Sequence, residues 1–288
     1  MIGRTHRQHA TITTVGHWLC EIANGIITSL SNFILSVDDL RAKFSGFIGT
    51  RASYKILFRT DPKLIANQTL QFLHIKEDKM TGQTVHQSYY VPYFSNFVSI
   101  CGDLAKFAED IRGLQQTEVG ELFEKKLQDR VGSSTGAHKA NPIDSENVGG
   151  QWRQLKVRLS SVFDDFLTDF QRDLRDSSNK RYYIPEIISI GFSIITRVIR
   201  IVNNMTIRKE QMLRNIQITK GLIISEGLQL ILQQWCGYNC ENFIDCYDYV
   251  KKLSEEAIDQ GVPLNAIIKK DQFVMTAHWT PFQKIGKI

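Results

Sequence analysis

The sequence predicts an all-α protein in which a bundle of long helices is followed by a small C-terminal helical domain. The first observation behind this prediction is a series of apolar residues that begins at Val15 and continues to residue 44. These residues recur about every 3.6 positions, which is the period of one helix face. A second series, from Val91 to Ile111, has the same period. A rod of about 30 residues is on the order of 45 Å long, so its apolar stripe must be covered by neighbouring rods from its own chain or from others.

The ends of the first three predicted helices follow from local signals. Asp61 before Pro62 is typical of an N-cap and a first helical residue, and predicts a shorter helix that ends near Ile75. The two apolar series described above predict a first long helix over residues 15–44 and a second long helix over residues 89–127.

Two further helices are expected after residue 146. The third rod is predicted from Asn147 to about Arg175, interrupted near its start by two glycines. Pro185 is expected to open a fourth helix over residues 187–205. That segment is apolar almost all round, which predicts a central position in the bundle.

The chain changes character after residue 205. Shorter helical segments, more polar residues and turns at Gly237 and Gly261 follow. We therefore expect two domains: a central long-helix domain over residues 1–205 and a C-terminal helical domain over residues 206–288.

The composition of the chain predicts a globular protein without a nucleic-acid-binding groove or a membrane span. The 288 residues are 42% apolar, which is ample for a core. The net charge is +5, but Lys and Arg are mixed with Asp and Glu, so the sequence predicts no nucleic-acid groove. The most apolar stretch, residues 187–196, has ten uncharged residues, which is half of the ~20 residues that a membrane span needs. Five cysteines without an even framework and the lack of a signal-peptide pattern predict a cytoplasmic location.

The most informative segment covers residues 132–147 and reads Gly-Ser-Ser-Thr-Gly-Ala-His-Lys-Ala-Asn-Pro-Ile-Asp-Ser-Glu-Asn. Its small residues let the backbone approach a ligand closely. Lys139 and Asn141 offer a positive charge and amide hydrogen bonds, which suit a carboxylate that gains negative charge during a reaction. On composition alone, a plain Gly/Ser loop between two helices is the alternative.

This segment closely resembles the signature loop of the fumarase/aspartase superfamily, Gly-Ser-Ser-x-Met-Pro-x-Lys-x-Asn-Pro. His138, Ile143-Asp144 and Glu146-Asn147 are most similar to the adenylosuccinate lyase branch in its bacterial form. Gly136 and Ala137 stand where the family has Met-Pro.

The resemblance implies a β-elimination with roles for named residues. Ser133 would be the base that takes the Cβ proton, for which its alkoxide needs nearby backbone N–H groups and an ammonium. Asn147 would add a substrate contact at the start of the following helix. The remaining substrate-binding positions of the loop, which would hold the succinyl carboxylates, are Ser134, Lys139, Ala140 and Asn141.

A second block, residues 3–10, reads Gly-Arg-Thr-His-Arg-Gln-His-Ala and is similar to the Gly-Arg-Thr-His-x-Gln-x-Ala segment of the same family. The resemblance makes His6 the general acid that protonates the departing nitrogen. Histidine suits this role because its ordinary pKa lies near neutral pH. His9 and His17 are expected to be ordinary solvated histidines.

A third block, residues 172–181, resembles the Arg-Asp-x-x-Asp-Ser-(Ser/Thr)-x-x-Arg segment of adenylosuccinate lyases, which holds the nucleotide phosphate. Two guanidinium groups with hydroxyls between them suit a phosphate dianion. The alternative is a polar helix end with pairing between Asp176 and Lys180. Gln83 lies where the family has a substrate-binding glutamine. In the same segment, Ser88 stands where the family usually has Asp. The implied phosphate ligands are Arg172, Ser177, Ser178 and Arg181.

The resemblance implies cleavage of adenylosuccinate to AMP and fumarate, and of the succinylated carboxamide ribotide, in purine biosynthesis. It implies no metal or organic cofactor, and a homotetramer whose active sites combine residues of three subunits. Family members have an N-terminal domain before the Thr-His segment, which nothing here matches. We therefore also consider a fragment or split half of such an enzyme, a degenerate copy that serves as a helical oligomerisation module, or another superfamily enzyme such as a cycloisomerase.

Overall fold

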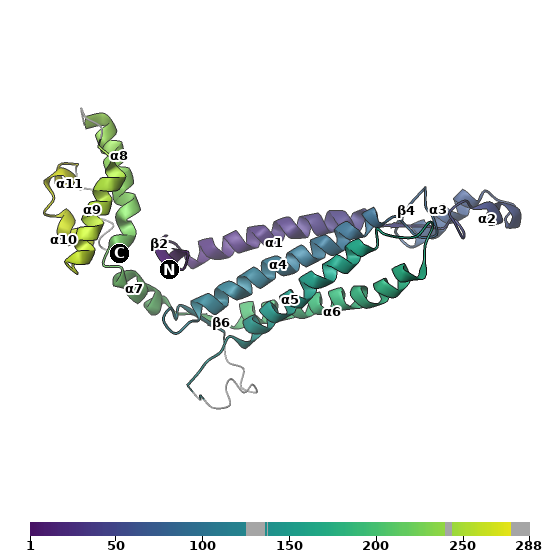
Figure 1. The fold of residues 1–288 in the computed structure, drawn as a ribbon, viewed down its shortest axis with the longest axis horizontal. Helices are drawn as coiled ribbons and strands as arrows, with labels where there is room; N and C mark the ends of the chain where they lie inside the picture. The colour runs from purple at the N-terminus through teal and green to yellow at the C-terminus, as the bar shows by residue number, and fades with distance from the viewer. Residues whose placement is uncertain (125–135, 137, 240–243, 278–288) are drawn as a thin grey trace. The chain divides into compact units, whose positions relative to one another are not determined.

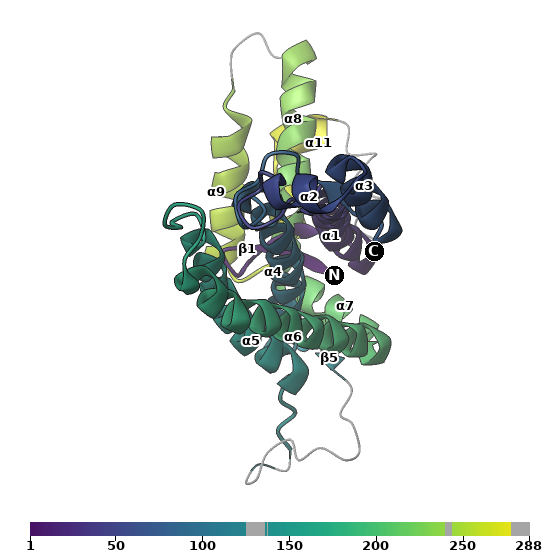
Figure 2. The same ribbon diagram turned by 90° about the vertical axis from the view of Figure 1, so that its right-hand side faces the viewer.

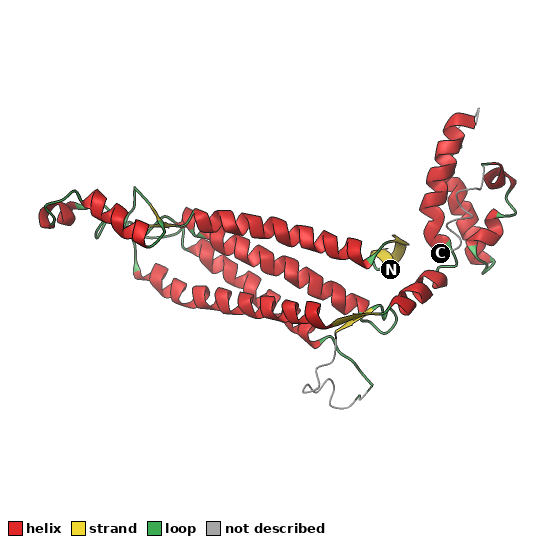
Figure 3. Cartoon of the chain, turned by 180° about the vertical axis from the view of Figure 1, so that it is seen from behind, coloured by secondary structure: helices red, strands yellow, loops and turns green. Residues whose placement is uncertain are grey.

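The computed structural model describes residues 1–124, 136, 138–239 and 244–277. These residues are mainly helical, with short two-stranded sheets (Figures 1 and 3). The chain divides into two compact units. The bundle unit comprises Cys20–Thr117 and Leu122–Thr206, and the hairpin unit comprises Met1–Leu19, Glu118–Glu121 and Ile207–Ile288. The boundary between residues 206 and 207 also separates these two units, but the first 19 residues group with the C-terminal helices. The predicted division into domains 1–205 and 206–288 therefore stays a prediction.

Four long rods confirm the predicted all-α class. They are α1 (Val15–Asp38), α4 (Val91–Leu114), α5 (Ile143–Asp164) and α6 (Leu174–Asn204). From Cys20 onward α1 belongs to the bundle unit. Figures 1 and 3 show α4, α5 and α6 lying side by side along the bundle.

The core of the bundle unit lies between α4, α5 and α6. Tyr183 of α6 is almost fully buried and meets Phe94 of α4 edge to face, with ring centroids 5.6 Å apart. Such a core gains stability in proportion to the apolar area removed from water. Other side chains with 0% exposure at this core are Cys101, Ala108, Ile111, Val148, Leu155, Val162, Ile187 and Ile194.

Helix α1 lies along α4 through both polar and aromatic contacts. Ser29 Oγ donates to Asp103 Oδ2 over 2.6 Å, and the rings of Phe33 and Tyr93 are 5.1 Å apart. Several apolar side chains of α1 nevertheless remain 41–66% exposed, namely Ile27, Leu30, Ile34, Leu35 and Val37.

The length and apolar composition of α1 bear on whether the chain could cross a membrane. Among the described helices, it alone is long and apolar enough to cross a membrane, judged by length and composition only. One such helix is weak support for a membrane span, because the core helix of a soluble protein passes the same test. The predicted lack of a membrane span stays a prediction.

Several predicted helix ends were wrong where a tertiary contact sets the boundary. Helix α1 ends at Asp38 rather than near residue 44, since β3 (Arg41–Ala42) pairs in parallel with β4 (Lys76–Glu77). Helix α4 ends at Leu114 rather than residue 127, and β5 (Leu122–Glu124) follows it and pairs with β6 (Met205–Ile207). Helix α5 covers residues 143–164 instead of 147–175.

The prediction that Pro185 opens the fourth helix was also wrong. Helix α6 begins eleven residues earlier, where the Asp173 side chain accepts a hydrogen bond from the Arg175 N–H over 2.7 Å. Pro185 lies inside the helix, where it lacks a backbone donor. By contrast, the predicted cap at Asp61 is confirmed, because Asp61 Oδ1 accepts from the Lys63 N–H at the start of α3 (Pro62–Phe72).

One end of the bundle unit carries α2 (Ala52–Leu57) and α3, which are labelled in Figure 2, and the 3₁₀ helix η1 (Gln87–Tyr89). Lys43 Nζ donates to the carbonyls of Gly46 and Gly82, each over 2.8 Å. Gly49 has a φ of 82°, and a Cβ there would lie 1.9 Å from the Thr81 carbonyl oxygen. Only glycine fits this position, so the turn over residues 43–49 fixes the segment that precedes Gln83.

The hairpin unit begins with the antiparallel strands β1 (Ile2–Thr5) and β2 (Gln8–Ile12), which the all-α prediction did not include. Its helical part has a core that contains Leu228, Leu232, Val250, Leu264 and Ile268. The elements of this part are α7 (Lys209–Ile218), η2 (Leu222–Ile224), α8 (Ser225–Asn239), α9 (Cys246–Asp259), α10 (Leu264–Ile268) and α11 (Gln272–Thr276).

The close contact between α4 and α6 yields a prediction. A Cβ added at Gly191 would lie 2.3 Å from Phe97 Cε1, and that ring is held by Phe33 and Phe192. We expect Gly191→Ala to lower the free energy of unfolding by about 1–3 kcal/mol, measured by urea unfolding with circular dichroism. Gly150→Ala is the control, because nothing lies within 4 Å of that Cβ. It should be neutral or stabilising by up to ~1 kcal/mol, and equal losses in both variants would contradict the packing argument.

Candidate functional site

The predicted site residues lie in three places in the chain. His6 is at the tip of the β1–β2 hairpin. A second group flanks the start of α5, and a third lies near the start of α6. Ser133 and Ser134 lie outside the described residues. The second group comprises Lys139, Ala140, Asn141 and Asn147, and the third comprises Gln83, Arg172, Ser177, Ser178 and Arg181.

The hairpin presents His6 in an unusual backbone conformation. Thr5 pairs with Gln8, so His6 and Arg7 are the two central residues of the turn. Their φ angles are 51° and 63°. Positive φ at both central residues is the geometry of a two-residue hairpin turn, which normally favours Asn and Gly. Non-glycine residues held in this region cluster at functional sites, and His6 is exposed there.

A buried ion pair anchors the strand that leads to His6. Arg4 Nη2 donates to Glu121 Oε1 over 2.6 Å, and Arg4 Nη1 donates to Oε2 over 3.1 Å. Asn215 Nδ2 donates to the same carboxylate over 2.8 Å. Glu121 has 0% exposure. A buried carboxylate is stable only when it is paired and hydrogen-bonded, so these three residues fix β1 two positions before His6.

The same cluster affects His9, which pairs with Arg4 across the hairpin. Partial burial and the Arg4 charge lower the pKa of His9, and Glu121 opposes them. The lowered pKa favours a neutral imidazole at pH 7.

Two predicted substrate ligands meet in this structure. Arg172 Nη1 lies 3.5 Å from Gln83 Oε1, although the residues are 89 positions apart. Ser178 and Arg181 are three positions apart on the first turns of α6, and both are exposed. Residues at this spacing share one helix face. The start of α6 therefore presents hydroxyl and guanidinium donors to solvent.

The alternative pairing between Asp176 and Lys180 is replaced by other contacts. Asp176 is buried, and its Oδ2 accepts from Thr168 Oγ1 over 2.7 Å. Lys180 Nζ lies 3.3 Å from Asp165 Oδ2. These contacts tie the start of α6 to the residues that follow α5.

Asp165 is the centre of a buried polar network below this surface. Its Oδ2 accepts from Tyr183 Oη over 2.6 Å and from Tyr90 Oη over 3.1 Å. Burial and the Asp165 carboxylate raise the pKa of both tyrosines well above its ordinary value. Both phenols therefore remain protonated donors, and this network holds α4, the end of α5 and α6 together below the predicted phosphate ligands.

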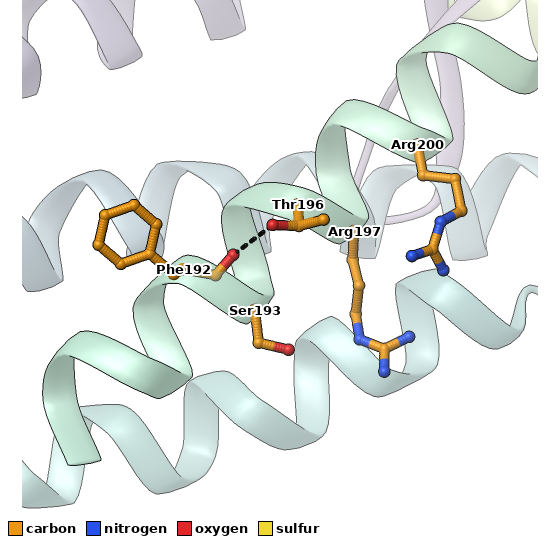
Figure 4. A pocket seen from close by; sticks show the side chains of 5 residues that line it. All are labelled: Phe192, Ser193, Thr196, Arg197 and Arg200. Carbon is orange, nitrogen blue, oxygen red and sulfur yellow. Dashed lines mark hydrogen bonds between the residues drawn. The ribbon is translucent and has the colours of Figure 1, made fainter. Parts of the chain in front are cut away.

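A different set of charges holds the first turn of α5. Arg197 Nη1 and Arg200 Nη1 donate to Asp144 Oδ1 over 2.8 and 3.1 Å. Both arginines line an open pocket of about 250 Å³. Figure 4 shows their side chains beside the other lining residues. Its lining contains none of the predicted site residues and consists of Phe192, Ser193, Thr196, Arg197 and Arg200.

The cysteine, histidine and carboxylate side chains of the described residues are the candidate ligands for a metal ion. Within the ranges that the structure describes, no three His, Cys, Asp or Glu side chains form a ligand set. Cys236 Sγ and Cys246 Sγ are 3.8 Å apart, and Cys240 lies outside those ranges.

The length of α5 separates the second and third groups of predicted residues. Helix α5 has 22 residues, so it is about 33 Å long. Asn147 lies in its second turn, whereas Arg172 lies beyond its other end. The structure therefore brings Gln83 to Arg172 but does not bring either to Lys139–Asn147 within one chain.

The ion pair below His6 gives a prediction about stability. We expect Glu121→Gln to lower the free energy of unfolding by about 3 kcal/mol, because Arg4 loses its bidentate partner at a site with little solvent. Urea unfolding measures this loss. Glu118→Gln makes the same chemical change at an exposed residue of the same segment and should stay within about 0.5 kcal/mol of the wild type. A loss below about 1 kcal/mol for Glu121→Gln would show that the pair behaves as a surface salt bridge.

Comparison with known proteins adds independent information. The model of a protein family described as Lyase matches residues 1–156. The chain is 32% identical to an adenylosuccinate lyase of Archaeoglobus fulgidus over 281 residues, which is 95% of this chain and 60% of that enzyme. It is 30% identical to an adenylosuccinate lyase of Bacillus subtilis over 273 residues, covering 94% and 61%. The chain thus spans about 60% of the length of these curated relatives.

Solved structures confirm the fold. A fumarate lyase from Mesorhizobium sp. BNC1 aligns with a TM-score of 0.80 at 20% identity, covering 96% of this chain and 60% of that one. A 3-carboxy-cis,cis-muconate lactonizing enzyme from Pseudomonas putida aligns with a TM-score of 0.79 at 23% identity, covering 96% and 59%. The family match covers more than half of the 288 residues, and the relatives align with nearly the whole chain. The chain therefore belongs to the lyase family of the fumarase/aspartase superfamily.

Proposed function

We propose that this chain carries the C–N lyase chemistry of an adenylosuccinate lyase. The reaction would cleave adenylosuccinate to AMP and fumarate, and the succinylated carboxamide ribotide in the same way, as steps of purine biosynthesis. The observation that carries this proposal is the sequence of residues 132–147, which matches the family's signature motif position by position except at Gly136 and Ala137. The chain that contains it is about 30% identical to adenylosuccinate lyases over nearly its full length. Its location would be cytoplasmic.

The proposed reaction assigns one proton transfer to each catalytic residue. Ser133 takes the Cβ proton of the succinyl group, and the electron pair of that C–H bond forms the double bond of fumarate. The C–N bond breaks, and its electron pair stays on the nitrogen of AMP. His6 donates a proton to this nitrogen. Histidine suits this role because its ordinary pKa is near the working pH.

The described part of the loop supports a role in carboxylate binding. Lys139 is exposed, and its N–H donates to the Gly136 carbonyl over 2.9 Å. The Ile143 N–H donates to the Asn141 carbonyl over 3.0 Å. These short-range bonds order the backbone on both sides of Ala140. Ser134, Lys139 and Asn141 would then hold the succinyl carboxylates and stabilise the charge that develops in the transition state.

The start of α6 is the proposed phosphate site. Arg172 and Arg181 would supply guanidinium donors, and Ser177 and Ser178 would supply hydroxyls. Gln83 would bind the substrate beside Arg172, and their 3.5 Å contact supports this grouping. A cycloisomerase of the same superfamily would not need these phosphate ligands.

The proposal also includes a homotetramer with shared active sites. The ~33 Å length of α5 keeps Asn147 and Arg172 apart in one chain. A site containing both must therefore use more than one copy. Exposed apolar residues on α6, including Phe192 at 60% and Ile199 at 56%, offer a surface that other copies would cover.

The experiment that tests this function is adenylosuccinate cleavage followed by ultraviolet absorbance. The chain is assayed alone and mixed with a separately expressed segment that supplies the part of the Archaeoglobus fulgidus enzyme outside the match. Cleavage in either sample supports the proposal. If neither sample cleaves adenylosuccinate although the nucleotide phosphate binds, the proposal is contradicted. That outcome would favour a helical oligomerisation module, in which Gly136 and Ala137 loosen the loop.

Replacing the proposed base gives a sharper prediction. We expect Ser133→Ala to lower kcat by about 10²- to 10⁴-fold while adenylosuccinate still binds, because only the proton acceptor is lost. Single-turnover kinetics and calorimetry measure the two quantities. Ser160→Ala is the control, since Ser160 is exposed on α5 and its Oγ donates only to the local Val157 carbonyl. Turnover retained by Ser133→Ala would rule out Ser133 as the base.

A further inference from the structure

Two side chains hold the two described stretches that lie on either side of residues 125–135, the second of which belongs to the signature loop. One flank is β5, which ends at Glu124 and is labelled in Figure 2. The other flank is the stretch from Lys139 to the start of α5 at Ile143. Gln115 and Glu124 contact the second flank, although neither belongs to the family motifs described above.

Gln115 follows the last residue of α4 and is only 6% exposed. Its Nε2 donates to the Ala140 carbonyl over 2.9 Å. Its Oε1 accepts from the Glu124 N–H over 2.8 Å. The amide thus uses its donor and its acceptor on different flanks, and a buried amide with both groups satisfied has one favoured orientation. One side chain therefore sets the separation of the two flanks.

Glu124 fixes the beginning of α5. Its Oε2 accepts from the Asp144 N–H over 3.1 Å, and its Oε1 accepts from the Ser145 N–H over 2.8 Å and from Ser145 Oγ. The N-cap residue of α5 is Pro142, which supplies no side-chain cap. Helix N-termini have unpaired N–H groups and a partial positive charge, and a carboxylate satisfies both. A residue of β5 therefore caps α5 and sets the position of Asn147.

We propose that Gln115 and Glu124 act together as positioning residues for the carboxylate-binding side of the active site. The proposal rests on the function proposed above. The Gln115 bond is at Ala140, between Lys139 and Asn141, and the Glu124 bonds are at the first turn of α5. Donors that stabilise a developing charge must be in place before the reaction, and a displacement of about 1 Å can cost 10²-fold in rate.

The geometry separates this role from general support of the bundle. The bundle core consists of apolar contacts between α4, α5 and α6, and these contacts do not involve the Gln115 amide. Loss of the amide should therefore free residues 138–147 while the helices stay packed. Turnover should then fall more than substrate affinity.

The test uses the full chain and the variants Gln115→Met and Glu124→Ala. Met has nearly the shape of Gln but cannot make either hydrogen bond. The control is Gln151→Met, which makes the same change at a half-buried glutamine whose Nε2 donates to Ser193 Oγ between α5 and α6. Glu124→Gln is the conservative variant, because it keeps one acceptor oxygen for the start of α5.

Hydrogen exchange and kinetics give separate readouts. We expect amide exchange over residues 138–147 to be at least about tenfold faster in Gln115→Met and Glu124→Ala, and unchanged in Gln151→Met. We expect kcat to fall by about 10- to 100-fold, with KM within about threefold and Tm close to that of the control. Glu124→Gln should recover part of the lost kcat.

Each alternative outcome has a defined meaning. Unchanged exchange over residues 138–147 would overturn the proposal. So would an equal loss of kcat in Gln151→Met, since the effect would then be general destabilisation. A wild-type chain that cleaves no adenylosuccinate, either alone or mixed with the added Archaeoglobus fulgidus segment, would refute the proposed function instead. The exchange measurement would still decide whether Gln115 and Glu124 hold this segment.

Discussion

The stiffness and length of the central helices form the constraint on which the rest of the arrangement depends. A helix of 22 residues holds its ends about 33 Å apart, and the packing of α4, α5 and α6 prevents it from bending to bring them together. Charged and hydroxyl donors therefore collect at opposite ends of the bundle unit. Asp144, held by Arg197 and Arg200, is at one end, and the Asp165 network is at the other. Each end has its own polar support.

Polar side chains in this protein mostly stabilise backbone positions near the predicted functional groups. Glu121 fixes the strand before His6, Glu124 caps α5, and Asp173 caps α6 beside Arg172. Three carboxylates thus act on three segments that the family resemblance connects with function. Burying or ordering a carboxylate costs free energy, and each of these carboxylates offsets that cost by accepting hydrogen bonds from several donors. The apolar core supplies the rods, and these carboxylates decide where the segments begin.

The rods could be predicted from the sequence because helical periodicity is a local property, as the series from Val15 and Val91 shows. Boundaries set by distant partners could not. The start of α5 depends on Glu124, and Pro185 lies inside α6 because Asp173 caps it earlier. Resemblance to family segments predicted Gln83 and Arg172 as substrate ligands, and the structure places these two side chains in contact, although their role stays a prediction. Gln115 and Glu121 were missed because their contacts span 25 and 117 positions. The roles of His6 and Ser133 stay predictions.

The anchoring of the hairpin has a consequence for biosynthesis. Arg4 is translated 211 positions before Asn215, with which it shares the Glu121 carboxylate. At roughly 5–20 residues per second, the ribosome needs on the order of 10–40 s to cover that distance. Contacts of such long range form late in folding. During that interval the nascent chain exposes the apolar residues of α1 without the anchored hairpin that precedes this helix, and such exposed apolar surface is what chaperones protect.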